Sequence, residues 1–143
     1  MKILFVCTGN SCRSVMAKAY LEKRLKELKK RGIIVSSAGI SPFPGMHATK
    51  EAQEVLGKEG VDVSDHVARR LTDLEIREAD LIFVMEEMHK RYILERDPQA
   101  EKKIRLLNIA DPIGRDMDFY EKNFAVIKEA IERILKEIDG KKD

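Results

Sequence analysis

Short apolar runs alternate with segments of helical periodicity along this chain. A continuous apolar run is typical of a strand that is buried on both faces of a parallel sheet, whereas apolar positions three or four residues apart indicate an amphipathic helix. The runs predict strands at residues 3–6, 33–37, 81–85 and 104–107.

The periodic segments between them predict helices at residues 15–30, 48–56 and 86–96. We expect Gly32 to close the first of these helices and Gly57 or Gly60 to cap the second. The polar segment 62–70 is predicted as irregular chain with a short helix. A long final helix should bury one apolar face, made of Tyr120, Phe124, Ile127, Ile131, Ile134 and Ile138.

Strands that alternate with helices predict an α/β fold with three layers, a four-stranded parallel sheet with helices on both faces. We expect a single domain over residues 1–143, because no internal repeat, low-complexity stretch or linker divides the chain. Ligands of such sheets bind at the carboxyl ends of the strands. The segment that follows the first strand is therefore the first candidate site.

Composition and charge narrow the classes of function. A content of 43% hydrophobic and 36% charged residues is typical of a soluble globular protein. The net charge is only +2 and no basic block stands out, so we do not expect nucleic acid as a partner. No apolar run is long enough to span a membrane and the N-terminus lacks the features of a signal peptide, so we expect a cytoplasmic protein without a membrane partner.

Two cysteines that both lie within residues 7–12 are a poor disulfide framework and too few for a structural zinc site. We expect no metal and no other cofactor, and we expect a monomer.

The segment Cys7-Thr8-Gly9-Asn10-Ser11-Cys12-Arg13-Ser14 lies between the first predicted strand and the first predicted helix. A glycine-containing loop in that position gathers backbone N–H groups and the positive end of the helix dipole into an anion-binding cup. Such a cup stabilises a thiolate at its floor, and a guanidinium matches two phosphate oxygens. The segment therefore predicts a phosphate site with Cys7 as nucleophile and Arg13 as phosphate ligand. The other candidate phosphate-binding residues are Thr8, Gly9, Asn10, Ser11, Cys12 and Ser14.

This arrangement suits phosphoryl transfer without a metal, because loop N–H groups and a guanidinium can neutralise the three equatorial oxygens. Cys7 would attack phosphorus to form a thiophosphate, and the Ser14 hydroxyl would assist departure of the sulfur. The leaving group needs a proton from a facing loop. Asp111 is the candidate general acid, because it stands in an Asp-Pro turn directly after a predicted strand.

At these residues the chain resembles the low-molecular-weight protein tyrosine phosphatase family, whose loop has the pattern Cys-x-Gly-Asn-x-Cys-Arg-Ser-Pro. The resemblance covers nearly the whole chain and includes Ser37-Ala38-Gly39, His66-Val67-Ala68-Arg69 and Asp111-Pro112. It implies that Cys7 is the nucleophile, Arg13 the phosphate-binding arginine, Asp111 the general acid and Cys12 a neighbouring redox cysteine. It also implies that a hydrogen-bond network braces the loop, formed by Asn10, Ser14, Ser37 and His66.

Phosphorylated proteins are the substrates that this resemblance implies, with inorganic phosphate or vanadate as further ligands of the loop. Two substrate classes stay open. Phosphotyrosine needs aromatic walls, for which only Phe43 is well placed. Phosphoarginine would suit a small hydroxylated residue at the rim of the loop, which we expect Ser11 to be.

Several alternatives stay open beside this hypothesis. An arsenate reductase on the same fold needs resolving cysteines downstream, and the sequence contains none after Cys12. A non-catalytic phosphate-binding module would need neither a thiolate nor an acid. Cys12 either fills space or traps an oxidised Cys7 as a reversible disulfide. We expect His47 and His89 at the surface. The acidic groups of the segment Met85-Glu86-Glu87-Met88-His89 either face a cationic arginine side chain of the substrate or lie on a solvated helix face, and we expect the solvated face.

Overall fold

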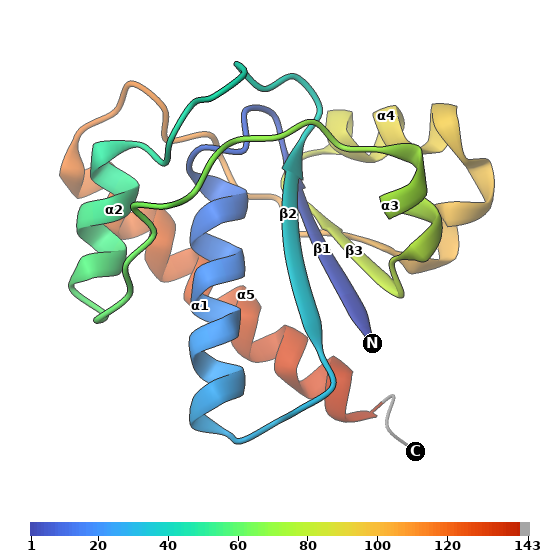
Figure 1. Cartoon of the computed structure of the whole chain (residues 1–143), viewed down its shortest axis with the longest axis horizontal. Coiled ribbons are helices and arrows are strands. Elements are labelled where there is room, and N and C mark those ends of the chain that lie inside the picture. The colour runs from blue at the N-terminus through green and yellow to red at the C-terminus, as the bar shows by residue number, and fades with distance from the viewer. Residues whose placement is uncertain (141–143) are drawn as a thin grey trace.

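The computed structural model describes residues 1–140 and contains a four-stranded parallel sheet in the order β2-β1-β3-β4 (Figure 1). The central strand β1 pairs in parallel with β2 on one side and β3 on the other, and β3 pairs in parallel with β4. The strands are β1 (Lys2–Cys7), β2 (Ile34–Gly39), β3 (Leu81–Val84) and β4 (Ile104–Leu106).

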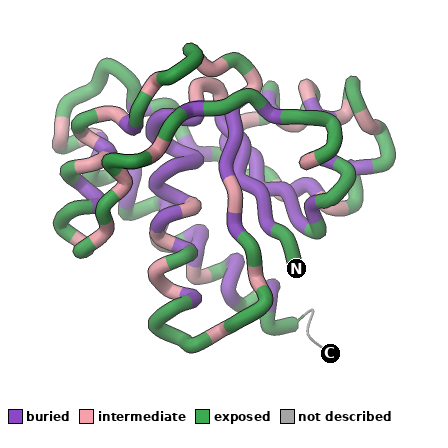
Figure 2. Tube along the Cα trace, in the orientation of Figure 1, coloured by how far each residue is buried: buried purple, intermediate pink, exposed green. Residues whose placement is uncertain are grey.

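The sheet separates two hydrophobic cores, because successive side chains of a strand point to opposite faces. Ile3, Phe5 and Cys7 of β1 belong to the core on one face, which is covered by α1 (Arg13–Glu27), α2 (Lys50–Gly57) and α5 (Met117–Gly140). Leu4 and Val6 belong to the core on the other face, which is covered by α3 (Asp73–Glu78) and α4 (Glu87–Arg96). Figure 2 shows most of the sheet as buried, while the helices turn exposed residues outward. The predicted three-layer α/β fold is confirmed.

The first helix and the second strand differ from their predicted bounds. α1 ends at Glu27, and Lys29 has a φ of 55°, so the chain leaves the helix before Gly32. Gly32, with a φ of 79°, lies in the turn that leads to β2 and not at the helix end. β2 continues through Ala38 and Gly39 because the register pairs them with Val6 and Cys7 of β1. These small residues carry no apolar pattern that could have shown the extension.

The short helix predicted within 62–70 is wrong, since that segment contains neither helix nor strand. The helix lies further on, at α3, where Thr72 and Glu75 form a reciprocal capping box. A 3₁₀ helix, η1 (Pro98–Lys103), also escaped prediction. The final helix is confirmed, with its expected face buried: Tyr120, Phe124, Ile127, Ile131, Ile134 and Ile138.

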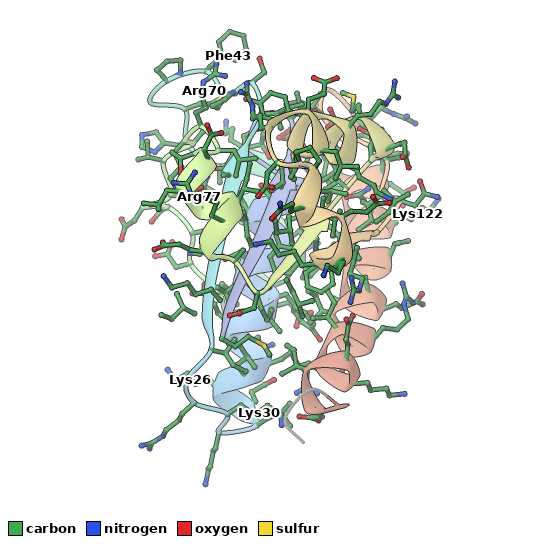
Figure 3. All side chains as sticks on the ribbon, turned by 90° about the vertical axis from the view of Figure 1, so that its right-hand side faces the viewer. Lys26, Lys30, Phe43, Arg70, Arg77 and Lys122 are labelled. Atoms are coloured by element: carbon green, nitrogen blue, oxygen red, sulfur yellow. The ribbon has the colours of Figure 1, made fainter. Side chains whose placement is uncertain are left out.

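The carboxyl ends of the strands and the loops that follow them gather at one end of the molecule (Figure 1). In Figure 3, Phe43 marks this end, and Lys26 and Lys30 mark the opposite end. No helix in residues 1–140 is both long and apolar enough to cross a membrane.

Candidate active site

The candidate loop joins the carboxyl end of β1 to the first turn of α1. Cys7 is the last residue of β1 and Arg13 the first residue of α1. Asn10 adopts the left-handed region with a φ of 53°, which asparagine tolerates better than most side chains do. The loop turn lies directly against Gly39, where an added Cβ would stand 2.6 Å from the Thr8 carbonyl oxygen. Only glycine at position 39 lets β2 and the loop approach this closely.

Asn10 is the hub of the loop, and every polar group of this residue is hydrogen-bonded. Its Nδ2 donates to Ser14 Oγ at 2.8 Å and to Ser37 Oγ at 3.0 Å. Its Oδ1 accepts from the backbone N–H of Arg69 at 3.1 Å, and its carbonyl oxygen is 2.6 Å from His66 Nε2. The structure thus joins the four residues of the predicted bracing network and adds the Arg69 backbone to them.

The Cys7 sulfur lies buried at the floor of the loop between two polar groups. Ser14 Oγ is 2.9 Å from Cys7 Sγ, and the backbone N–H of Asn10 donates to the same sulfur at 3.3 Å. Because Ser14 Oγ already accepts from Asn10 Nδ2, its own proton is available to the sulfur. Both donors would interact more strongly with a negative sulfur than with a neutral thiol.

Arg13 is buried, and its guanidinium contacts residues of the segments that follow β3 and β4. One terminal nitrogen, Nη1, donates to the Ile109 carbonyl at 2.8 Å and lies 3.0 Å from Glu86 Oε2. Within residues 1–140, Arg13 Nε is one of two buried side-chain polar atoms without a hydrogen-bond partner in the protein. An unsatisfied buried N–H is costly, and a bound anion would satisfy it.

Asp111 lies beside this guanidinium although nearly a hundred residues separate the two in sequence. Its Oδ2 is 3.6 Å from Arg13 Nη2, and its Oδ1 accepts from the backbone N–H of Ile113 at 3.1 Å. The side chain is 39% exposed, so it is accessible to solvent beside the buried guanidinium. The structure therefore places Cys7, Arg13 and Asp111 around one site.

Cys12 lies beneath Asp111, with its sulfur 3.8 Å from Asp111 Oδ1. Burial raises the pKa of the Cys12 thiol to about 12, and the neighbouring Cys7 and Asp111 act in the same direction. At neutral pH Cys12 is therefore a protonated thiol that can donate to the carboxylate.

Of the two residues considered for substrate specificity, Ser11 lies differently from our expectation. It is only 2% exposed, so its side chain packs within the loop and does not stand at the rim. Phe43 is 75% exposed, which leaves its ring accessible.

Sequence reasoning did not favour a role in this site for two residues, Glu86 and His89. The expected surface position of His89 is wrong: it is fully buried, with Nε2 2.9 Å from Thr8 Oγ1. Glu86 pairs with Arg13 and is not simply part of a solvated helix face, whereas Glu87 is exposed as expected. Both residues follow β3, and the carboxyl end of β3 adjoins that of β1. The expectation that neighbouring parallel strands end side by side could therefore have indicated that residues after β3 lie near the Cys7 loop.

The buried His89 predicts a loss of stability in acid. Burial lowers its pKa from 6.5 to about 4, and the charge of Arg13 acts in the same direction. Between these values the unfolded chain binds a proton that the folded chain does not, so stability is fully present above about pH 6.5 and is lost as the pH falls through about 4. The difference between the two pKa values corresponds to a loss of about 3 kcal/mol in the free energy of unfolding. The pKa of His66 is also lowered by burial, with the same sign.

Urea unfolding measured across this pH window should show a shallower pH dependence for His89→Asn than for the wild type. Equal slopes for the two proteins would contradict the buried neutral state of His89.

The fold and the loop together define an α/β protein with a cysteine and an arginine at a phosphate-type loop. The family described as low molecular weight phosphotyrosine protein phosphatase matches residues 2–143, and the chain belongs to this family.

Its relatives include proteins named for two different substrates. A probable low molecular weight protein-tyrosine-phosphatase, EpsP, from Ralstonia nicotianae is 38% identical over 96% of this chain and 91% of its own length. A protein-arginine-phosphatase from Bacillus subtilis is 33% identical over 100% of this chain and 99% of its own length.

A solved structure adds chemical information. It is the arginine phosphatase YwlE in a cysteine-to-serine mutant with a phosphorylated active-site serine. It superimposes with a TM-score of 0.88 at 31% identity and covers 97% of this chain and 96% of its own.

Proposed function

We propose that this protein is a cysteine-dependent protein phosphatase that hydrolyses phosphorylated protein side chains. The observation that carries the proposal is the Cys7 sulfur at the loop floor, held by Ser14 Oγ at 2.9 Å and the Asn10 N–H at 3.3 Å. Binding of phosphate alone would need no nucleophile in this position. An arsenate reductase would need further cysteines, and Cys7 and Cys12 are the only two in the chain.

The reaction that fits this geometry has two steps. In the first, Cys7 enters as the thiolate and Asp111 as the protonated acid. The sulfur attacks phosphorus, the bond from phosphorus to the departing atom breaks, Asp111 gives its proton to that atom, and a thiophosphate forms. In the second, Asp111 takes a proton from water, water attacks the same phosphorus, and the sulfur leaves with help from the Ser14 hydroxyl. Arg13 and the loop N–H groups balance the oxygen charges in both steps, so the chemistry requires no metal.

The relatives support a covalent intermediate at the loop cysteine. In YwlE the residue that replaces the active-site cysteine is phosphorylated, as expected for a side chain that attacks phosphorus directly. A free thiol at Cys7 suits a reducing compartment, and we infer a cytoplasmic location on this ground.

Phosphotyrosine and phosphoarginine are the two substrate classes that the relatives' names support. The decisive experiment measures turnover of matched peptides that carry either group, with a chelator present throughout. We expect hydrolysis of at least one peptide and of p-nitrophenyl phosphate, with inhibition of both by vanadate. Failure of all these substrates, or a strict need for added metal, would overturn the proposal.

A further inference from the structure

His89 takes part in the loop architecture although it lies outside the loop. It stands in the first turn of α4, is 0% exposed, and contacts the residue that follows Cys7. A fully buried histidine ring with both nitrogens hydrogen-bonded has a defined donor and a defined acceptor.

The hydrogen bonds of the ring fix its tautomer. The backbone N–H of Glu86 donates to His89 Nδ1 at 3.0 Å, so Nδ1 must be the unprotonated nitrogen. In the neutral ring the proton then resides on Nε2, which donates to Thr8 Oγ1 at 2.9 Å. Protonation of Nδ1 would place two donors against each other and break the contact with Glu86.

Burial is the main cause that keeps the ring neutral. Among the charges that face it, Arg13 of α1 disfavours the imidazolium, while Glu86 at the N-cap of α4 and Asp111 of the downstream loop favour it. Burial and Arg13 prevail and lower the pKa to about 4. The positive end of α4 acts in the same direction, because His89 lies in its first turn. The donor at Nε2 is therefore present throughout the neutral range.

Two hydrogen bonds hold Thr8, and together they fix the position of the turn that directly follows the nucleophile Cys7. Its side chain is tied to α4 through His89, and its carbonyl oxygen accepts from the backbone N–H of Ser41 at 2.9 Å. The Asn10 network described above braces the other half of the loop, and none of its hydrogen bonds involves His89. The two anchors therefore act on different halves of one loop.

We propose that His89 is a positioning residue: its Nε2–H holds the Thr8 side chain, and with it the turn after Cys7, in the geometry that the transition state requires. This inference rests on the proposed function. Loop N–H groups stabilise a transition state only when they are already aimed at the developing charge. Loss of the anchor should therefore lower kcat and leave KM nearly unchanged.

Two substitutions of His89 separate its two hydrogen bonds. His89→Asn keeps an acceptor near the Nδ1 position for the Glu86 N–H but cannot reach Thr8. His89→Gln places a donor near the Nε2 position and loses the acceptor. We expect His89→Asn to lower kcat by about 10-fold, the value of one buried hydrogen bond, and His89→Gln to recover most of that loss. Arg91→Gln, on the exposed side of the same helix, is the matched control.

A double-mutant cycle tests whether His89 acts through Thr8. Thr8→Val should lower kcat by about 10-fold alone, and the double variant Thr8→Val/His89→Asn by about 10-fold as well, not by about 100-fold. Additive losses, or a lower melting temperature with kcat unchanged, would overturn the positioning role. A third measurement needs no variant: the ring ¹⁵N shifts at about pH 6 should show Nε2 protonated and Nδ1 bare. A protonated Nδ1 would also overturn it.

The outcome for the wild-type chain separates this inference from the function on which it rests. A wild type that hydrolyses none of the substrates overturns both. A wild type that turns over at the rate of His89→Asn overturns the role of His89 alone.

Discussion

Replacement of Cys7 by serine is expected to abolish turnover while leaving the fold intact. The substitution exchanges a sulfur for a smaller oxygen at a fully buried position, and the contacts of Ser14 and Asn10 with that atom are compatible with a hydroxyl. A neutral hydroxyl is a far weaker nucleophile than a thiolate, and a phosphoserine is harder for water to cleave than a thiophosphate. Loss of a nucleophile in a comparable covalent mechanism lowers kcat by about 10⁶-fold.

The measurement combines steady-state turnover of p-nitrophenyl phosphate with intact-mass analysis of the variant after incubation with substrate. We expect no multiple turnover and a slow rise of a single phosphate adduct on the new serine, as in the phosphorylated relative. Cys12→Ser, which removes the other thiol, is the matched control and should lose less than about 10-fold. Turnover by Cys7→Ser within about 10-fold of the wild type would rule out covalent catalysis by Cys7.

The short loop of the candidate site is fixed by contacts with several elements of the fold. Asn10 ties the loop to β2 through Ser37, Gly39 permits the close approach, and His89 ties it to α4. Each anchor comes from an element that ends or begins at the carboxyl edge of the sheet. The parallel topology therefore supplies a rigid cup from residues that are far apart in sequence.

The loop itself could be predicted from the sequence because its chemistry is local. A strand, a cysteine, a glycine, an arginine and a helix start follow one another within Ile3–Ser14. An Asp-Pro pair directly after a predicted strand also made Asp111 a candidate, and the structure places it beside Arg13. The fold class followed from the alternation of strand and helix patterns, which is a property of the whole chain.

The segment 62–70 was predicted in part wrongly because tertiary backbone bonds decide its conformation. The Gly39 N–H donates to the Arg69 carbonyl, and the Leu71 N–H donates to the Gly39 carbonyl, both at 2.9 Å. Arg70 thus forms a parallel bridge with Gly39 beside the sheet. No local pattern contains this pairing, and it is incompatible with a helix through Arg70.

His89 was missed for a similar reason. Its polarity and its place among charged residues favour an exposed position, and only the packing of the α4 N-terminus against the loop makes it buried. The pairing of Glu86 with Arg13 likewise depends on the order of strands, which places β3 beside β1.

Replacement of Asp111 by asparagine is expected to cause the second large loss of activity. The size of the loss in rate should depend on the leaving group of the substrate. Asparagine is nearly isosteric and can still accept from the Ile113 N–H, but it cannot transfer a proton. General acid catalysis contributes about 10²- to 10⁴-fold where the departing atom needs a proton. We expect phosphopeptides and alkyl phosphates to slow by about 10³-fold, and p-nitrophenyl phosphate, whose phenolate leaves unaided, by about 10-fold.

The test is a plot of log kcat/KM against leaving-group pKa for a series of aryl phosphates, measured for the wild type and for Asp111→Asn. The wild-type line should be nearly flat and the variant line steep, because the uncatalysed departing oxygen then carries its full negative charge. Asp116→Asn is the matched control, since Asp116 lies in the same region but accepts from the Phe119 N–H at the start of α5. Equal slopes for the wild type and Asp111→Asn would show that Asp111 is not the general acid. The proton donor would then have to be another group near Arg13, and Glu86 is the remaining carboxylate within 4.0 Å of that guanidinium in the described part of the chain.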